Sequence, residues 1–96
     1  MMIELNTTFT QEEKDALQGY GDVDIKRFID SQKLFHSSVQ GNVAMENPNR
    51  LIGVGGLYLV ELKDEPGEWY MGQRHKGDTY HFWGCYGDLK NALEGL

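Results

Sequence analysis

Apolar and polar residues follow a helical pattern near both ends of the chain. Thr10-Gln11-Glu12-Glu13 fits a capping box, in which the side chains of Thr10 and Glu13 each bond to the other's backbone amide. The helix that begins there ends at Gly19 or Gly21. Near the C-terminus, Gly87-Asp88 precedes an apolar stripe at i, i+3, i+4 and i+7, formed by Leu89, Ala92, Leu93 and Leu96. The pattern predicts a helix at each end.

A further helix is predicted between residues 22 and 33. Asp22 or Asp24 can cap it, and the helical spacing is carried by Ile25, Phe28 and Ile29. We place its end near Gln32 or Lys33.

From Phe35 onward the apolar residues alternate with polar ones, which is typical of strands. Gly41-Asn42 is a two-residue hairpin signal. Three further turns or loops are indicated at Asn47-Pro48-Asn49, Asp64-Glu65-Pro66-Gly67 and Lys76-Gly77-Asp78. Strands are predicted between these breaks, at 35–40, 43–45, 57–62, 69–74 and 79–86. The segment 57–62 is apolar on both faces and is predicted to be a central strand.

These elements predict a single α+β domain over residues 1–96, with an antiparallel β-sheet of about four to five strands. The N-terminal helices and the short C-terminal helix are expected to pack on one face of the sheet. Because three short helices can cover one face and not two, the opposite face, or its acidic rim, is expected to be free for a partner.

The charge of the chain narrows the classes of partner. With 15 acidic and 9 basic residues the net charge is −6, which repels nucleic-acid backbone and anionic membranes. A basic protein partner is compatible with this charge, including a nucleic-acid-binding protein whose groove the acidic surface could occupy. No direct nucleic-acid binding and no membrane binding are expected.

Cysteine content and hydropathy indicate the compartment. The only cysteine is Cys85, so an intramolecular disulfide cannot form. The first residues lack the basic and long apolar segments of a signal peptide. The longest apolar run, 51–60, is too short to span a bilayer. A cytoplasmic location is expected, in the host cytoplasm if the protein is encoded by a phage.

No catalytic, cofactor or metal site is predicted. The glycines Gly53, Gly55 and Gly56 lead into a strand and not into a helix, so they indicate a bend or bulge and not a phosphate loop. His36, His75 and His81 are irregularly spaced. On an unbroken strand, His81 and Cys85 would share one face about 13 Å apart, too far for one metal. Cys85 lies among aromatic residues and is expected to be buried in the core.

The expected function is therefore a non-enzymatic protein-binding module. Residues 67–72 and 83–90 resemble, in style, short phage and prophage accessory proteins. The negative charge, the small size, the missing catalytic groups and the surplus of aromatic strand residues favour an inhibitor of a host protein, encoded by a phage or mobile element. The partner surface is expected to combine acidic and aromatic side chains, at Glu61, Asp64, Glu65, Glu68, Trp69 and Tyr80. Two alternatives remain open. One is a small enzyme or ligand-binding domain that uses the Cys85/His81 region, and the other is a structural subunit that completes its sheet by homodimerisation.

Overall fold

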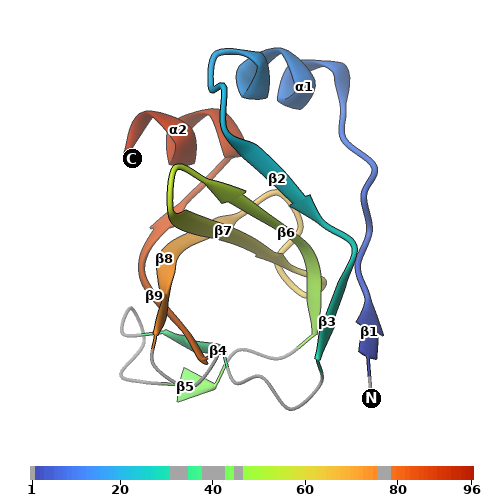
Figure 1. The fold of residues 1–96 in the computed structure, drawn as a ribbon, viewed down its shortest axis with the longest axis vertical. Coiled ribbons are helices and arrows are strands. Elements are labelled where there is room, and N and C mark those ends of the chain that lie inside the picture. Colours follow the sequence, from blue (N-terminus) through green and yellow to red (C-terminus); the bar gives the residue numbers. More distant parts are fainter. Residues whose placement is uncertain (1, 31–34, 38–42, 45–46, 76–78) are drawn as a thin grey trace.

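The part of the chain that the structure describes forms a curved β-sheet and two short helices (Figure 1). The computed structural model describes residues 2–30, 35–37, 43–44, 47–75 and 79–96, and only the backbone of residues 30, 35–37, 43–44, 75 and 79. In chain order the elements are β1 (Met2–Glu4), α1 (Gln11–Gln18), β2 (Val23–Lys26), β3 (Phe28–Asp30), β4 (Phe35–Ser37), β5 (Val43–Ala44), β6 (Pro48–Val54), β7 (Leu57–Leu62), β8 (Trp69–His75), β9 (Thr79–Tyr86) and α2 (Leu89–Glu94).

The main sheet has the strand order β2-β6-β7-β8-β9-β4-β5 within the described residues. Its pairs are antiparallel except β4 with β9, which run parallel. β1 and β3 form a separate antiparallel ribbon. The predicted α+β class with a mostly antiparallel sheet is confirmed, but the sheet has more strands than the four to five expected.

Each face of the sheet carries a hydrophobic core among the described residues. On one face α1 and α2 cover a core that is formed by Phe9, Leu17, Ile52, Val54, Leu59, Trp69, Met71, Leu89, Ala92 and Leu93. On the other face the curved sheet and residues of the β1–β3 ribbon enclose Leu5, Ile29, Leu51, Val60, Leu62, Tyr70, Tyr80 and Phe82. The expectation of a free face opposite the helices is therefore wrong, because the sheet curves and closes on its own second core.

The two terminal helices form where the sequence predicts them. The capping box of α1 is complete, since the Glu13 amide donates to Thr10 Oγ1 and the Thr10 amide donates to Glu13 Oε1. The side chain of Asp88 accepts from the Asn91 amide and caps α2. The hydroxyl of Tyr20 donates to the carbonyl of Leu93, which joins the end of α1 to α2 at 2.9 Å.

The helix predicted between residues 22 and 33 is not formed, and the described part of this segment consists of β2 and β3. Val23 and Ile25 are β-branched and alternate with polar residues, so they fit a strand as well as a helix. Ile25 pairs with Ile52 of β6, and Ile29 pairs with Ile3 of β1. These long-range pairings decide the local structure, as is common where propensity is ambiguous.

The segment 47–56 is a strand and a tight hairpin, where a loop and a bend were expected. Pro48 begins β6, a position that costs no ladder hydrogen bond. Gly55 and Gly56 join β6 to β7 with φ of +57° and +89°. Two successive positive φ values are typical of the type I′ hairpin turn, which follows the twist of the strands.

The other strand predictions are confirmed in part. β7, β8 and β9 lie where the sequence places them, and the turn at 64–67 separates β7 from β8. β4 and β5 pair antiparallel, as a hairpin predicts. The turns expected at Gly41-Asn42 and Lys76–Asp78 lie outside the described residues. Within the part of the chain that the structure describes, no helix has the length and apolar character needed to cross a membrane.

Candidate functional site

Three of the six residues expected at a partner surface are buried within the chain. The exposed fraction is 2% for Glu61, 0% for Trp69 and 4% for Tyr80. Trp69 and Tyr80 belong to the two cores, so neither can anchor a partner without unfolding. The remaining three lie at the turn between β7 and β8, where Asp64 and Glu68 are exposed and Glu65 is half-buried.

Glu61 is buried because it pairs with Arg50 on the neighbouring strand. Arg50 Nε donates to Glu61 Oε1 at 2.7 Å, and Nη2 donates to Oε2 at 2.6 Å. The opposite edge of the same guanidinium donates to both carboxylate oxygens of Glu13, at 2.7 and 2.9 Å. One arginine therefore joins α1, β6 and β7, and we call Arg50, Glu61 and Glu13 the Arg50 network.

Aromatic rings and further hydrogen bonds complete the network. The guanidinium carbon of Arg50 lies 5.0 Å from the ring centroid of Phe9 and 4.9 Å from that of Trp69. Arg50 Nη1 also donates to the Thr8 carbonyl at 3.1 Å. Because the nitrogens of the guanidinium already donate to the chain's own acceptors, this arginine is not available to bind an external anion.

The network keeps its charges although it is buried. Burial alone would raise the pKa of Glu61, but hydrogen bonds from Arg50, the Gly67 amide and Asn49 outweigh it and hold that pKa below its usual value. For Glu13 burial is likewise outweighed, by Arg50 and the Thr10 backbone, so its pKa is lowered too. The two carboxylates in turn raise the pKa of Arg50 against the effect of burial.

Sequence reasoning did not identify the Arg50 network. One signal was available, since Glu61 interrupts the apolar run of a strand predicted to be central. A charge at such a position needs a buried partner. The sequence does not show which basic residue supplies it, because the pairing of Arg50 with Glu61 depends on the register of β6 against β7.

The turn between β7 and β8 is held from inside the molecule. The Gly67 amide donates to Glu61 Oε2 at 2.8 Å, and the hydroxyl of Tyr70 donates to Glu65 Oε2 at 2.7 Å. Backbone bonds from the Glu65 amide to Leu62 and from the Glu68 amide to Glu65 close the turn. We call Asp64, Glu65 and Glu68 on this segment the acidic turn.

Cys85 is exposed, so the expectation that it is a core residue is wrong. It lies opposite Tyr70 in the β8–β9 ladder and near the acidic turn. Partial burial and the negative charges of Glu68 and Glu65 raise the pKa of its thiol. Because the thiolate is the reactive form, this environment weakens Cys85 as a nucleophile at neutral pH.

A bulge in β9 separates Cys85 from His81. Gly72 pairs with Phe82 but the preceding Met71 pairs with Gly84, so β9 has one extra residue at Trp83. His81 lies opposite Gln73 and Cys85 lies opposite Tyr70, three residues apart on β8, which places them on opposite faces of the sheet. The shared face assumed for an unbroken strand is wrong, and the two residues cannot form a Cys–His pair.

Gly72 makes the bulge possible. A Cβ atom at this position would lie 1.9 Å from the carbonyl oxygen of His81 and 2.6 Å from Cα of Phe82. Only glycine allows the two strands to approach so closely.

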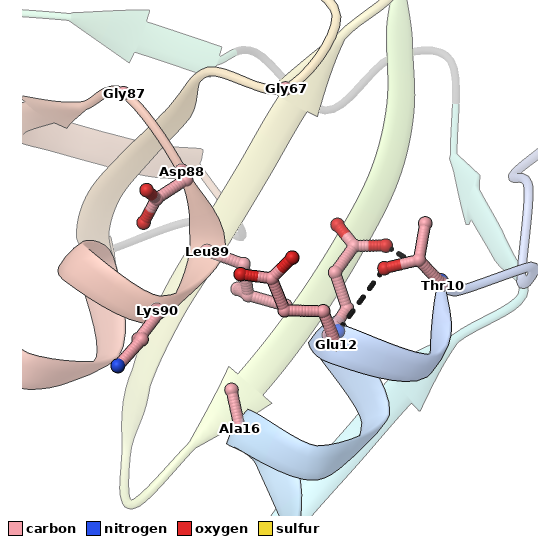
Figure 2. A pocket seen from close by; sticks show the side chains of 9 residues that line it. Thr10, Glu12, Ala16, Gly67, Gly87, Asp88, Leu89 and Lys90 are labelled. Atoms are coloured by element: carbon pink, nitrogen blue, oxygen red, sulfur yellow. Dashed lines mark hydrogen bonds between the residues drawn. The ribbon is translucent and has the colours of Figure 1, made fainter.

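A hollow of about 300 Å³ lies between the N-termini of the two helices. Figure 2 shows Glu12, Asp88 and Lys90 around it, with Ala16 and Leu89 at its wall. Thr10 and Asp88 already cap the helices that border it. A larger hollow of about 690 Å³ lies over the Arg50 network, whose guanidinium is occupied. Neither presents an activated nucleophile or an unpaired buried base among the described side chains.

Among the side chains that the structure describes, no group of three or more His, Cys, Asp or Glu residues could hold a metal ion. Comparison of the chain with models of protein families, with curated proteins and with solved structures found no match.

Proposed function

We propose that this chain is a non-enzymatic protein-binding module that binds a basic partner through the acidic turn. The observation that carries the proposal is that two hydrogen bonds hold this turn in one conformation. One runs from the Gly67 amide to Glu61, and the other runs from the Tyr70 hydroxyl to Glu65. A surface that is already held in its conformation loses little freedom on binding. Its carboxylates would steer a partner rich in lysine or arginine and fix its orientation.

The partner that best fits these features is a nucleic-acid-binding protein. Such proteins carry basic grooves, and a domain with a net charge of −6 could occupy one. An inhibitor encoded by a phage or mobile element, which acts on a host protein of this kind, is the corresponding biological role. In the proposed complex the exposed carboxylates take the place of nucleic-acid phosphates.

Charge reversal tests whether a basic partner binds to the acidic turn or is attracted only by the net charge of the chain. The double variant Glu65→Lys/Glu68→Lys should weaken the binding of an arginine-rich peptide by about tenfold or more at low salt. The control variant Glu4→Lys/Glu94→Lys has the same net charge but alters exposed acids elsewhere. It should weaken binding clearly less. Equal losses in the two variants, measured by titration calorimetry, would show that net charge alone attracts the peptide and would refute the acidic turn as a site.

A structural subunit that forms a homodimer is the second candidate, and β2 favours it. β2 stands at one end of the strand order, and its Ile25 is 41% exposed. If two copies paired antiparallel about Ile25, Asp24 of each copy would lie opposite Lys26 of the other. Sedimentation of the purified chain at several concentrations would show a dimer that Ile25→Lys dissociates, and a monomer throughout would exclude this candidate.

A further inference from the structure

The hollow of about 690 Å³ over the Arg50 network adjoins the acidic turn. Pro66 and Gly67 form part of its wall, and both lie between Glu65 and Glu68 in the sequence. Thr8, which precedes α1, lines it too. Thr8 and Pro66 are exposed, so the hollow is open to solvent. A partner that contacts the acidic turn would therefore also lie beside this hollow.

The floor of the hollow carries a net negative charge. Among the residues that line it, the charged ones are Glu13, Glu61 and Arg50, so one carboxylate has no cation of its own. Hydrogen bonds hold the pKa of both glutamates below the usual value, so both are ionised at neutral pH. Only 15% of the Glu13 side chain and 3% of the Glu61 side chain are exposed, so water and salt screen this charge less than a surface charge. The hollow therefore favours a cation.

The hydrogen bonds of the two glutamates show which one can bind that cation. A carboxylate has about four acceptor positions. Glu61 accepts four hydrogen bonds within the chain. Glu13 accepts three: Oε1 from the Thr10 amide and from Arg50, and Oε2 from Arg50. Within the described part of the chain, Glu13 Oε2 is therefore the position of the network that can accept another donor.

We propose that this hollow receives a lysine or arginine side chain of the basic partner, whose charged group donates to Glu13 Oε2. The methylene stem of that side chain packs against the ring of Pro66. The inference rests on the proposed function, because it assumes the same basic partner. It assigns the two parts of the surface different roles. The exposed acidic turn mainly speeds association, whereas a hydrogen-bonded charge in a hollow mainly slows dissociation.

The experiment measures association and dissociation rates of an arginine-rich peptide on the immobilised chain by surface plasmon resonance. Glu13→Gln keeps a residue that can complete the capping box, but it makes the Arg50 network neutral. This variant should raise the dissociation rate by about tenfold or more. Glu12→Gln removes the same charge from the neighbouring residue, which is exposed and lies outside the wall of this hollow. It should change the dissociation rate by about twofold or less.

A second pair of variants blocks the hollow without touching the network or changing the net charge. Thr8→Trp places a large ring at the wall of the hollow. Thr7→Trp makes the same change at the preceding residue, which is exposed and does not line it. Thr8→Trp should raise the dissociation rate by about tenfold or more, and Thr7→Trp should leave it nearly unchanged. Circular dichroism of each variant shows whether the fold is kept.

The outcomes separate this inference from the proposed function. Equal dissociation rates for Thr8→Trp and Thr7→Trp would overturn the inference. If Glu65→Lys/Glu68→Lys still weakened binding more than Glu4→Lys/Glu94→Lys, the acidic turn would stand without the hollow. If those two charge-reversal variants weakened binding equally while Thr8→Trp alone speeded dissociation, the hollow would stand as the site and the acidic turn would be refuted.

Discussion

Arg50 and Glu61 lie side by side on β6 and β7 and are joined by two hydrogen bonds, from Nε to Oε1 and from Nη2 to Oε2. The pair connects more than two strands. Through Arg50 it holds Glu13 of α1, and through Glu61 it holds the amide of Gly67. Helix, sheet and acidic turn therefore depend on the same buried charges.

Removal of the Arg50 side chain should strongly destabilise the fold. Arg50→Ala leaves two buried carboxylates without their cation, and breaking such a group costs about 3–5 kcal/mol of unfolding free energy. Arg27→Ala alters an exposed arginine and should cost about 0.5 kcal/mol or less. Urea unfolding measures both. A similar small cost for the two variants would show that the Arg50 network contributes no net stability.

Acid should weaken the fold through the same carboxylates. The pKa values of Glu13 and Glu61 are lowered in the folded chain from an ordinary value of 4.5. The stability that these two carboxylates contribute is fully present above their pKa in the unfolded chain. It is lost as the pH falls through their lower pKa values in the folded chain. Glu61→Gln should be less stable at neutral pH and should flatten this acid dependence, as followed by thermal melting at a series of pH values. A slope unchanged by Glu61→Gln would assign the acid sensitivity to other carboxylates.

Cys85 should be accessible to thiol reagents but slow to react at neutral pH. It is exposed, and partial burial together with Glu68 and Glu65 raises the pKa of its thiol. In the native chain, labelling should reach one equivalent, and Glu65→Gln/Glu68→Gln should speed it by lowering that pKa. Glu94→Gln is the control for a lost acid elsewhere. An equal labelling rate in all three proteins would contradict the influence of the acidic turn on the thiol.

Gly72→Ala should disrupt the β8–β9 pairing. The added Cβ would meet the carbonyl of His81 and Cα of Phe82, which are backbone atoms that cannot turn aside. We expect a loss of about 3 kcal/mol or failure to fold. Gly21→Ala has open space around its Cβ and should change stability by about 1 kcal/mol or less. Hydrogen exchange at β9 amides would locate the damage, and normal protection there would contradict it.

Local signals predicted the elements that local chemistry determines. Thr10 and Asp88 mark the starts of the two helices because a cap needs only residues of its own turn. β8 and β9 follow from period-two alternation, β7 follows from a run that is apolar on both faces, and turns that contain proline or glycine bound these strands. Each of these features lies within a few neighbouring residues.

The features that could not be predicted from the sequence are those that depend on long-range strand pairing. Val23–Lys26 is a strand because β6 is available to pair with it, and Glu61 is buried because Arg50 lies beside it. The bulge at Trp83 depends on the close approach of two strands at Gly72, and it inverts the side of the sheet expected for Cys85. Such features depend on register, which no local pattern specifies.

The connectivity of the sheet also determines the order in which the chain can fold. β6, β7, β8 and β9 are neighbours both in sequence and in the sheet, so their pairing closes only short loops. β2 and β4 join this meander across long stretches of chain, as the pairs Val23 with Val54 and Phe35 with Tyr80 show. Closing long loops is slow. Substitutions within the meander should therefore alter the folding rate, whereas those in β2 or β4 should mainly alter the unfolding rate.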